Sequence, residues 1–364
     1  MILAHLSDLH LGHRGFDRWD RGVNLRERDV ARAFGFALDA LVQLAPDVIV
    51  VTGDVFDRPD PSPQALVTLT RGIESLHRAL PETPLYFVAG ARDTPRRAGD
   101  NGALAALDAF PSVTAATSLP FAHTHQDLSL HVQLIPHRTV LRGPSPVAEP
   151  NPAARYNVLA TYGRVSLDDG PGLQLDPADW QYIALGSEHQ YRQIAPRAAY
   201  AGALERVGSE PWREAGHEKG FISVDLDSGQ TRFHPIPGRA VVALATTRAP
   251  TGAGAALRDR VTEVVREIPG GIAGKIVRVR LRGPAPGDLT ALAGTLPTLE
   301  AEALHLSVEV EAPGGAAAPE SAARLEDRAL QALDTDAAPS AGELLERVLS
   351  ASPTPGGPGG GQGS

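Results

Sequence analysis

The sequence predicts an α/β fold with a parallel or mixed sheet, because short apolar runs alternate with amphipathic helical patterns. Three runs lack a helical period and are typical of buried strands; they begin at Ile2, Asp47 and Leu85. Two segments between them carry apolar residues at steps of three and four. This βαβαβ order favours a sheet covered by helices.

The predicted elements can be placed in order. A helix from Asn24, which can act as its N-cap, to Leu44 is ended by Pro46, and a second helix covers about Ser62 to Leu80. Further strands are predicted at Val158 to Ala160 and Tyr182 to Leu185, followed by a hairpin of Phe221 to Leu226 with Thr231 to Pro235.

From Val241 the pattern changes to a second, small α+β unit. Its strands are predicted at Val241 to Ala245, Lys275 to Leu281 and Leu304 to Val310, and its helices at Gly254 to Glu267 and Asp288 to Leu296. After it we expect a Gly/Ala/Pro linker at Glu311 to Pro319. Two short helices are expected at Glu320 to Leu333 and Ala341 to Leu349, followed by a disordered tail from Ala351 to Ser364.

Length and composition bound the class of protein. With 364 residues the chain has room for two or three domains. It has no cysteine, which excludes disulfides, thiolate zinc sites and cysteine nucleophiles. A net charge of -9 argues against nucleic-acid binding by the field of the whole molecule and leaves a local basic groove open. We expect a cytoplasmic protein without a signal peptide or membrane span.

Polar side chains follow several of the predicted strands. Asp8 and His10 come after the first strand, Asp54 and Asp57 after the second, and His189 after the strand that ends at Leu185. Residues two apart in an extended chain point to the same side, so Asp8 and His10 are expected to face one point. Mixed oxygen and nitrogen ligands suit Mn, Fe or Zn, and ligands bind beyond the carboxyl ends of such strands.

The chain resembles the calcineurin-like metallophosphoesterases, and within them the SbcD nuclease family. The resemblance rests on Ser7-Asp-Leu-His-Leu-Gly12, Thr52-Gly-Asp-Val-Phe-Asp-Arg58, Pro61-Ser-Pro-Gln-Ala65, Ala201-Gly-Ala-Leu-Glu-Arg206 and Lys219-Gly-Phe221. It implies a four-layer α+β sandwich with a small capping domain. We therefore predict a metallophosphoesterase domain at 1–240, a capping domain at 241–312, a linker with short helices that can dock on an ATPase at 313–350, and a tail at 351–364.

The resemblance implies a two-metal site, usually with manganese, that cleaves DNA phosphodiesters. For the first metal it implies four ligands, with Asp54 bridging to the second: Asp8, His10, Asp54 and His189. Asp57 is expected to support the site. The other ligands of the second metal are replaced, by Ala91 for an asparagine and by Tyr162 and Ser187 for histidines. Neither a methyl group nor a phenol with a pKa near 10 ligates well at neutral pH.

Arg92 stands where the family has its catalytic histidine. Arginine, with a pKa above about 12, does not act as a general acid near pH 7, but its planar fork binds phosphate. Together with Arg96 and Arg97 it is predicted either to cradle a phosphate or to form a solvated basic loop.

Three hypotheses for the function follow. The first is an SbcD-like DNA exo- or endonuclease of a double-strand-break repair complex with impaired one-metal chemistry. The second is an inactive scaffold that binds DNA or a partner, and the third is a phosphoesterase acting on a small substrate. The resemblance also implies DNA and an SbcC-like coiled-coil ATPase as partners, and a homodimer formed through helices around Ser62 to Leu80 and Asn101 to Phe110.

Overall fold

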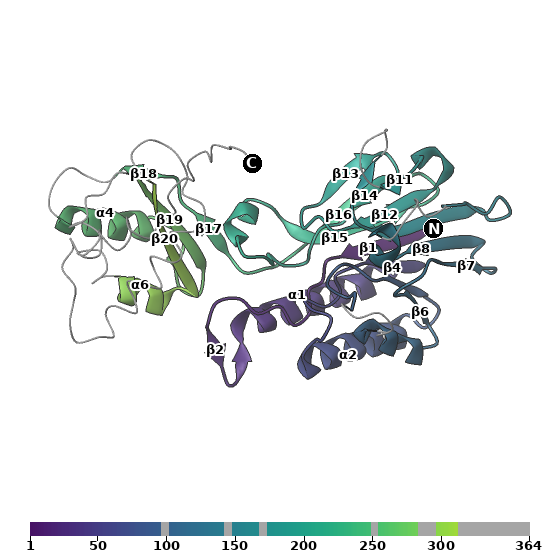
Figure 1. Ribbon diagram of the computed structural model, residues 1–364, viewed down its shortest axis with the longest axis horizontal. Coiled ribbons are helices and arrows are strands. Elements are labelled where there is room, and N and C mark those ends of the chain that lie inside the picture. The colour runs from purple at the N-terminus through teal and green to yellow at the C-terminus, as the bar shows by residue number, and fades with distance from the viewer. Residues whose placement is uncertain (96–101, 142–147, 167–172, 249–253, 283–295, 312–364) are drawn as a thin grey trace, which may run out of the picture. The chain divides into compact units, whose positions relative to one another are not determined.

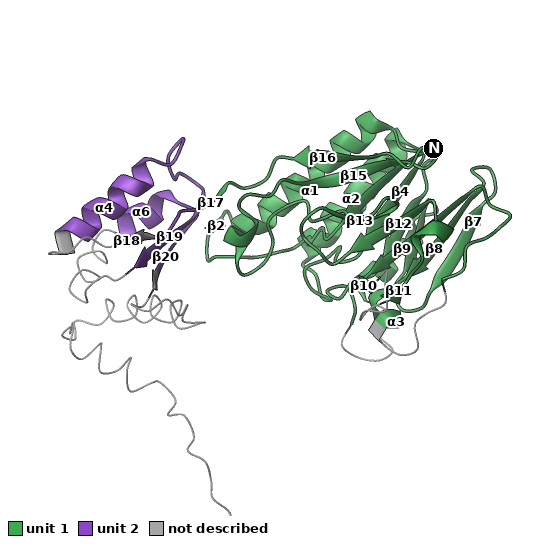
Figure 2. Cartoon of the chain, turned by 90° about the horizontal axis from the view of Figure 1, so that it is seen from above, with its two compact units in different colours: residues 1–241 green, residues 242–364 purple. Residues whose placement is uncertain are grey.

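A computed structural model describes residues 1–95, 102–141, 148–166, 173–248, 254–282 and 296–311. The chain divides into two compact units, 1–241 and 242–364 (Figure 2). Within the described residues no helix has the length and apolar character needed to cross a membrane.

Two six-stranded sheets form the centre of the first unit (Figure 1). In the first sheet, the neighbours β1, β4, β5 and β6 run parallel and β15 and β16 are antiparallel additions. Its strands are, in spatial order, β16 (Thr231–Ile236), β15 (Lys219–Asp225), β1 (Ile2–Ser7), β4 (Val48–Thr52), β5 (Leu85–Val88) and β6 (Val113–Ala116).

The second sheet has parallel central strands and antiparallel edge strands. Its strands are, in spatial order, β13 (Arg192–Ala195), β14 (Ala198–Tyr200), β12 (Tyr182–Gly186), β9 (Tyr156–Tyr162), β8 (Leu130–Ile135) and β7 (Phe121–His125). Two small pairs, β2 (Trp19–Asp20) with β3 (Val23–Asn24) and β10 (Val165–Ser166) with β11 (Leu173–Gln174), lie outside both sheets.

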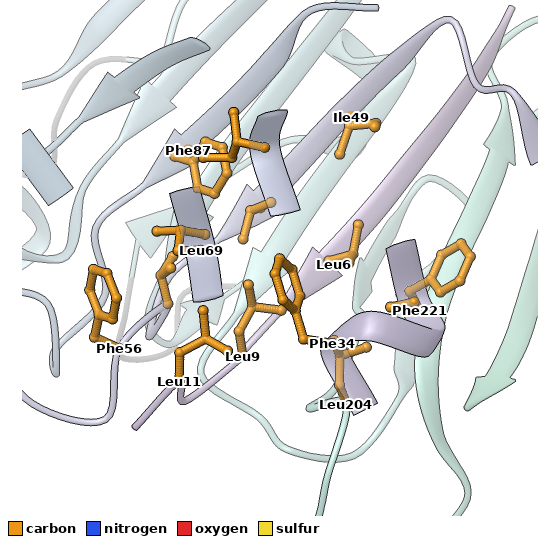
Figure 3. Packing of buried hydrophobic residues seen from close by; sticks show 14 of the residues in the cluster. Leu6, Leu9, Leu11, Phe34, Ile49, Phe56, Leu69, Phe87, Leu204 and Phe221 are labelled. Atoms are coloured by element: carbon orange, nitrogen blue, oxygen red, sulfur yellow. The ribbon is translucent and has the colours of Figure 1, made fainter. Parts of the chain in front are cut away.

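Helices α1 (Leu25–Leu44) and α2 (Pro63–Ala79) pack on the outer face of the first sheet. The side chain of Asn24 caps α1 by accepting from the backbone N–H of Arg26, as the sequence predicts. Figure 3 shows Leu6 of β1, Phe34 of α1, Leu69 of α2 and Phe87 of β5 in the core between helices and sheet. Burial of this apolar face positions the strand ends that carry the candidate site.

The two sheets pack face to face through a second apolar core that includes Val50, Val88, Val158 and Ala184. They approach so closely that a Cβ at Gly186 would lie 1.7 Å from the carbonyl oxygen of Thr52. Only glycine fits there, and it brings the carboxyl ends of β4 and β12 together.

The remaining described elements of the first unit are short. They comprise α3 (His137–Leu141) and three 3₁₀ turns at Ala103–Ala109, Pro177–Asp179 and Pro211–Glu214. The segment expected as a helix around 101–110 contains a 3₁₀ helix at Ala103–Ala109, in which Leu104 and Leu107 are buried.

The second unit contains its own four-stranded sheet with an apolar core on one face. Its elements are β17 (Val241–Ala243), β18 (Thr247–Arg248), α4 (Gly254–Arg266), β19 (Ile276–Arg282), α6 (Leu296–Glu302) and β20 (His305–Glu311). Most of the expected helix at 288–296, and the linker, helices and tail beyond 311, lie outside the described residues. Overall the α/β architecture of packed layers that the sequence predicts is confirmed.

Candidate metal centre

The site begins where the central strands of the two sheets end. Asp8 and His10 follow β1 and Asp54 follows β4, and all three adopt left-handed backbone angles, with φ of 49°, 48° and 45°. Hydrogen bonds between the two loops hold this conformation: Asp8 N–H donates to the Gly53 carbonyl at 3.0 Å and His10 N–H to the Asp54 carbonyl at 2.8 Å. Such strained backbone is maintained only where surrounding contacts enforce it, and it clusters at functional sites.

This backbone corrects one step of the sequence argument. We expected Asp8 and His10 to share a side because they lie two apart in an extended strand. The strand ends at Ser7, and both residues are left-handed instead. Their side chains nevertheless reach one point, together with His189 from the loop after β12: one ligand atom of each lies within 4.8 Å of the others.

The chemistry of these three side chains fits a divalent metal ion. Asp8 is fully buried, and its Oδ1 has no hydrogen-bond partner among the described residues. The Nε2 atoms of His10 and His189 face each other at 3.2 Å. Two ligands about 2.1 Å from one ion at angles near 90–110° lie roughly 3.0–3.4 Å apart, so this spacing suits a shared ion. In the metal-free protein it suits a hydrogen bond between the rings.

Burial and neighbouring charges set the protonation of the three groups. Burial raises the pKa of Asp8 to about 7. Burial also lowers the pKa of His10, which favours the neutral imidazole that a metal requires. For His189 burial acts downward, but the hydrogen bond to Glu214 and the charge of Asp8 raise its pKa overall.

Carboxylates orient both histidines from behind. Asp57 Oδ1 lies 3.1 Å from His10 Nδ1, and Glu214 Oε1 lies 3.3 Å from His189 Nδ1. Both contacts leave Nε2 directed to the site, the arrangement that metal-binding histidines usually show. Burial tends to raise the pKa of Asp57, but hydrogen bonds with His10 and His13 hold it well below its usual range, so it is ionised. Asp57 therefore supports the site by contacting a ligand.

Glu214 is itself held by a buried lysine. Lys219 is 2% exposed; its Nζ donates to Glu214 Oε2 and, at 2.6 Å, to the backbone carbonyl of His189. Lys219 therefore contacts both the backbone of His189 and the carboxylate that orients its ring. Neither Glu214 nor Lys219 was predicted as a site residue, since a contact between His189 and a residue 25 positions away follows no local pattern.

We expect Glu214→Gln to weaken divalent-metal binding by about 10- to 100-fold, because it removes the charge that fixes the ring of His189. Competition with a fluorescent chelator measures this. Glu210→Gln is the matched control, since Glu210 pairs with exposed Arg213 on the surface. Unchanged affinity in Glu214→Gln would show that the carboxylate does not act on the site.

Asp54 lies beside the three-residue group and accepts one hydrogen bond from a protein donor on each of its oxygens. Its Oδ2 is 3.8 Å from His10 Nε2 and accepts from the Tyr162 hydroxyl at 2.8 Å, while its Oδ1 accepts from Arg92 N–H at 2.7 Å. Burial and the negative charges of Asp8 and Asp54 raise the pKa of Tyr162, which keeps the phenol protonated. The hydroxyl thus donates to the Asp54 oxygen that lies nearest His10.

The other two replaced positions supply no ligand side chain in this arrangement. Ala91 is exposed in the loop after β5, and Ser187 contacts Asp8 through its backbone N–H, which donates to Oδ2 at 3.1 Å. Among the described residues, the group of Asp8, His10 and His189 is the one cluster of such side chains close enough to hold an ion.

A cavity of about 510 Å³ opens onto these residues. Arg92 is exposed and lines it, together with Arg14, Phe16 and Tyr162, so that guanidinium groups and the candidate ligands line the same cavity. Arg96 and Arg97 lie outside the described residues. His13, which was not predicted as a site residue, also lines the cavity and shares Asp57 with His10.

Asp93 has a structural role at the site. It is 4% exposed and accepts from the backbone N–H groups of Val55, Phe56 and Gly90, at 3.1, 2.9 and 2.9 Å. These bonds hold the loops after β4 and β5 together. Burial raises the pKa of Asp93 to about 7.

Comparison with known proteins agrees with this architecture. Residues 1–160 match the calcineurin-like phosphoesterase family. The chain is similar to proteins named DNA double-strand break repair protein Mre11. These include the Methanocaldococcus jannaschii protein, 30% identical over 31% of this chain and 29% of the relative. The Thermoplasma acidophilum protein is 24% identical over 64% of this chain and 64% of the relative. The Sulfurisphaera tokodaii protein is 33% identical over 26% of this chain and 23% of the relative.

These matches cover less than two thirds of the length of each relative. The family match, residues 1–160, includes the motifs around Asp8, His10 and Asp54, and the fold described above is the two-sheet sandwich that the resemblance implies. Residues 1–160 are therefore similar to the calcineurin-like phosphoesterases, and parts of the chain are similar to Mre11 proteins.

Proposed function

We propose that the chain is a metal-dependent phosphodiesterase of the DNA-repair nuclease type that works with one metal ion. The observation that supports the proposal is the difference between the three-residue group and Asp54 beside it. Asp8, His10 and His189 converge with a buried, unpaired carboxylate oxygen, whereas both oxygens of Asp54 already accept a hydrogen bond, from the Tyr162 hydroxyl and from the Arg92 N–H.

A divalent ion bound there, manganese in our proposal, would polarise a phosphoryl oxygen and lower the pKa of water. The chain's own residues do the rest. Asp57 and Glu214 fix the tautomers of His10 and His189, so that both present Nε2. Arg92 offers paired N–H donors to a phosphate, and Tyr162 keeps Asp54 in place through its hydroxyl.

One observation favours a second candidate, a catalytically silent scaffold that keeps the fold to bind DNA or a partner. No side chain with a pKa near neutrality takes the place of the family's catalytic histidine, since Arg92 stands there. Ala91 and Tyr162 depart from the ligand pattern in addition. The two candidates differ in whether phosphodiester hydrolysis depends on the Asp8 group.

We expect wild-type protein dialysed against manganese to retain about one ion per chain and to hydrolyse bis(p-nitrophenyl) phosphate and DNA slowly. The Asp8→Ala variant should lose the ion, and its rate of hydrolysis should fall by at least about 100-fold. Mass spectrometry gives the metal content and absorbance gives the rate. The triple variant Ala91→Asn, Tyr162→His, Ser187→His should bind about two ions and react faster, since it restores the second ligand set.

Each outcome separates the candidates. A rate that is the same in wild type and Asp8→Ala would assign the hydrolysis to a contaminant and leave the scaffold as the function. One ion per chain without any hydrolysis would also leave the scaffold as the function. About two ions in the wild type would contradict the one-metal site.

DNA as substrate, an SbcC-like coiled-coil ATPase as partner and a homodimer belong to the same proposal. Their support is that the relatives are DNA double-strand break repair proteins, together with the motifs at Thr52 to Arg58 and Ala201 to Arg206. Hydrolysis of a small phosphoester but not of DNA would favour the third hypothesis. Equal recovery of the ATPase with the full chain and with a chain lacking residues 320–364 would exclude docking through the C-terminal helices.

A further inference from the structure

A half-exposed tryptophan lies on the hairpin that precedes α1. Trp19 is 50% exposed and belongs to β2, which pairs with β3 directly before α1. Figure 1 shows this hairpin extending from the start of α1, away from the two sheets. An indole left half in water at the end of a hairpin forgoes the free energy that its burial would provide, so its exposure calls for an explanation.

The ring is held in a defined orientation. Its Nε1 donates to Asp17 Oδ1 at 2.6 Å, and its backbone pairs with Asn24, the residue that caps α1. The ion pair of Asp20 with Arg28 of α1, at 2.6 Å, ties the hairpin to the helix. A ring fixed in this way loses little conformational entropy when another planar group stacks on it.

Arg14 connects this ring to the cavity of the metal centre. Its guanidinium carbon lies 5.5 Å from the centroid of the indole, and Arg14 lines the same cavity as His10 and His189. The side chain is held by Glu27, whose carboxylate accepts from Nε at 2.8 Å. An aromatic face, a guanidinium and the candidate phosphate site thus follow one another along one surface of the first unit.

We propose that Trp19 and Arg14 form a stacking platform for an unpaired nucleobase of a nucleic-acid strand whose phosphodiester lies at the metal centre. The proposal rests on the proposed function, since it takes a phosphodiester chain as the ligand. Aromatic faces beside cationic groups are how proteins hold single strands without reading their sequence. With a net charge of -9, the chain must attract such a strand locally, and Arg14 and Arg92 supply positive charge at the cavity.

The connection of the Trp19 ring to the cavity through Arg14 favours a nucleobase over a protein partner as the group that stacks on it. An aromatic anchor for a protein contact is usually surrounded by further apolar surface. Around Trp19 the hairpin instead carries Asp17, Arg18, Asp20 and Arg21, and the group over its ring is the guanidinium of Arg14. Charged neighbours of this kind suit a strand that is charged along its backbone and aromatic at its bases.

The test is a titration of the full chain with a 12-nucleotide oligo(dT) in EDTA, followed by tryptophan fluorescence and by anisotropy of a labelled strand. Wild-type fluorescence should be quenched on binding. Trp19→Leu should weaken binding by about 5- to 50-fold, the loss expected for one stacked base. Trp19→Phe should bind within about threefold of wild type and lose the quenching, because Phe stacks and the other tryptophans, Trp180 and Trp212, remain buried or partly buried.

Two controls match this design. Phe121→Leu removes another half-exposed aromatic, 47% exposed on β7, and should change affinity by less than about twofold. An abasic strand of equal length should bind wild type and Trp19→Leu alike. Equal oligo(dT) affinity in wild type and Trp19→Leu, or quenching that persists in Trp19→Phe, would overturn the platform. A lower molecular mass of Trp19→Leu by light scattering, with unchanged affinity, would overturn it in favour of a protein contact.

Failure of this inference and failure of the proposed function are distinguishable. The titration in EDTA requires no hydrolysis, and hydrolysis of bis(p-nitrophenyl) phosphate by wild type requires no nucleobase. Hydrolysis without Trp19-dependent binding would overturn the platform alone. Trp19-dependent binding without hydrolysis would support the platform and overturn the phosphodiesterase.

Discussion

Asp8→Asn is expected to lower divalent-metal affinity at least about 100-fold and, at the same time, to make the metal-free protein more stable above neutral pH. The metal effect follows because Asp8 offers the one buried carboxylate oxygen in the three-residue group that has no partner among the described residues. Loss of residues that merely orient ligands already costs about 10- to 100-fold, so loss of a charged ligand costs at least the upper end of that range.

The stability effect follows from the pKa of Asp8. Burial raises it to about 7 in the folded protein, from an ordinary value of 3.8. The folded state therefore holds this proton more tightly than the unfolded chain does. The bound proton of Asp8 therefore makes its full contribution to the free energy of unfolding below about pH 4, and this contribution is lost as the pH rises to about 7. At about 1.36 kcal/mol per pKa unit, the free energy of unfolding falls by roughly 4 kcal/mol over that window.

Asparagine has no proton to lose and accepts left-handed backbone angles readily. The difference in unfolding free energy between Asp8→Asn and wild type should therefore grow by roughly 4 kcal/mol from pH 4 to pH 8 in EDTA. Urea unfolding at several pH values measures it. Asp60→Asn, at an exposed position, is the matched control and should show no such trend. A difference that does not vary with pH would show that Asp8 is ionised in the folded protein throughout.

Asp29→Ala is expected to destabilise the first unit by about 3–5 kcal/mol, because it removes the carboxylate to which buried Arg26 and partly buried Arg239 donate. Asp29 on α1 is 2% exposed. Its Oδ2 accepts from Arg26 and from Arg239, each at 2.8 Å. Arg26 is 1% exposed and also lies 3.6 Å from the carboxylate of Glu205.

This network also includes residues of the cavity wall. Arg26 and Arg206 both line the cavity, and the guanidinium of Arg26 donates to the backbone carbonyl of Arg206. Urea or thermal unfolding of Asp29→Ala measures the loss. Asp39→Ala, an exposed position on the same helix, should stay within about 0.5 kcal/mol of wild type. A loss below about 1 kcal/mol in Asp29→Ala would mean that water reaches Arg26 and replaces the carboxylate.

The sequence by itself determined the elements that depend on local burial. Short continuous apolar runs predicted β1, β4 and β5, period-3.6 patterns predicted α1 and α2, and Asn24 marked the start of α1. The motifs also led to the α/β class and to the phosphoesterase resemblance. These signals are local because each helix buries one face with residues at helical spacing, and each of these strands is buried along almost its whole length.

Tertiary structure alone decided how the site is assembled. Asp8 and His10 converge with His189 through left-handed turns that are held by hydrogen bonds to the loop after β4, and not through an extended strand. The contacts of Tyr162 with Asp54, of Glu214 with His189 and of Asp29 with Arg239 join residues 108, 25 and 210 positions apart. No spacing in the sequence encodes such pairs, because they depend on the path of loops whose conformation is set by the packing of the two sheets.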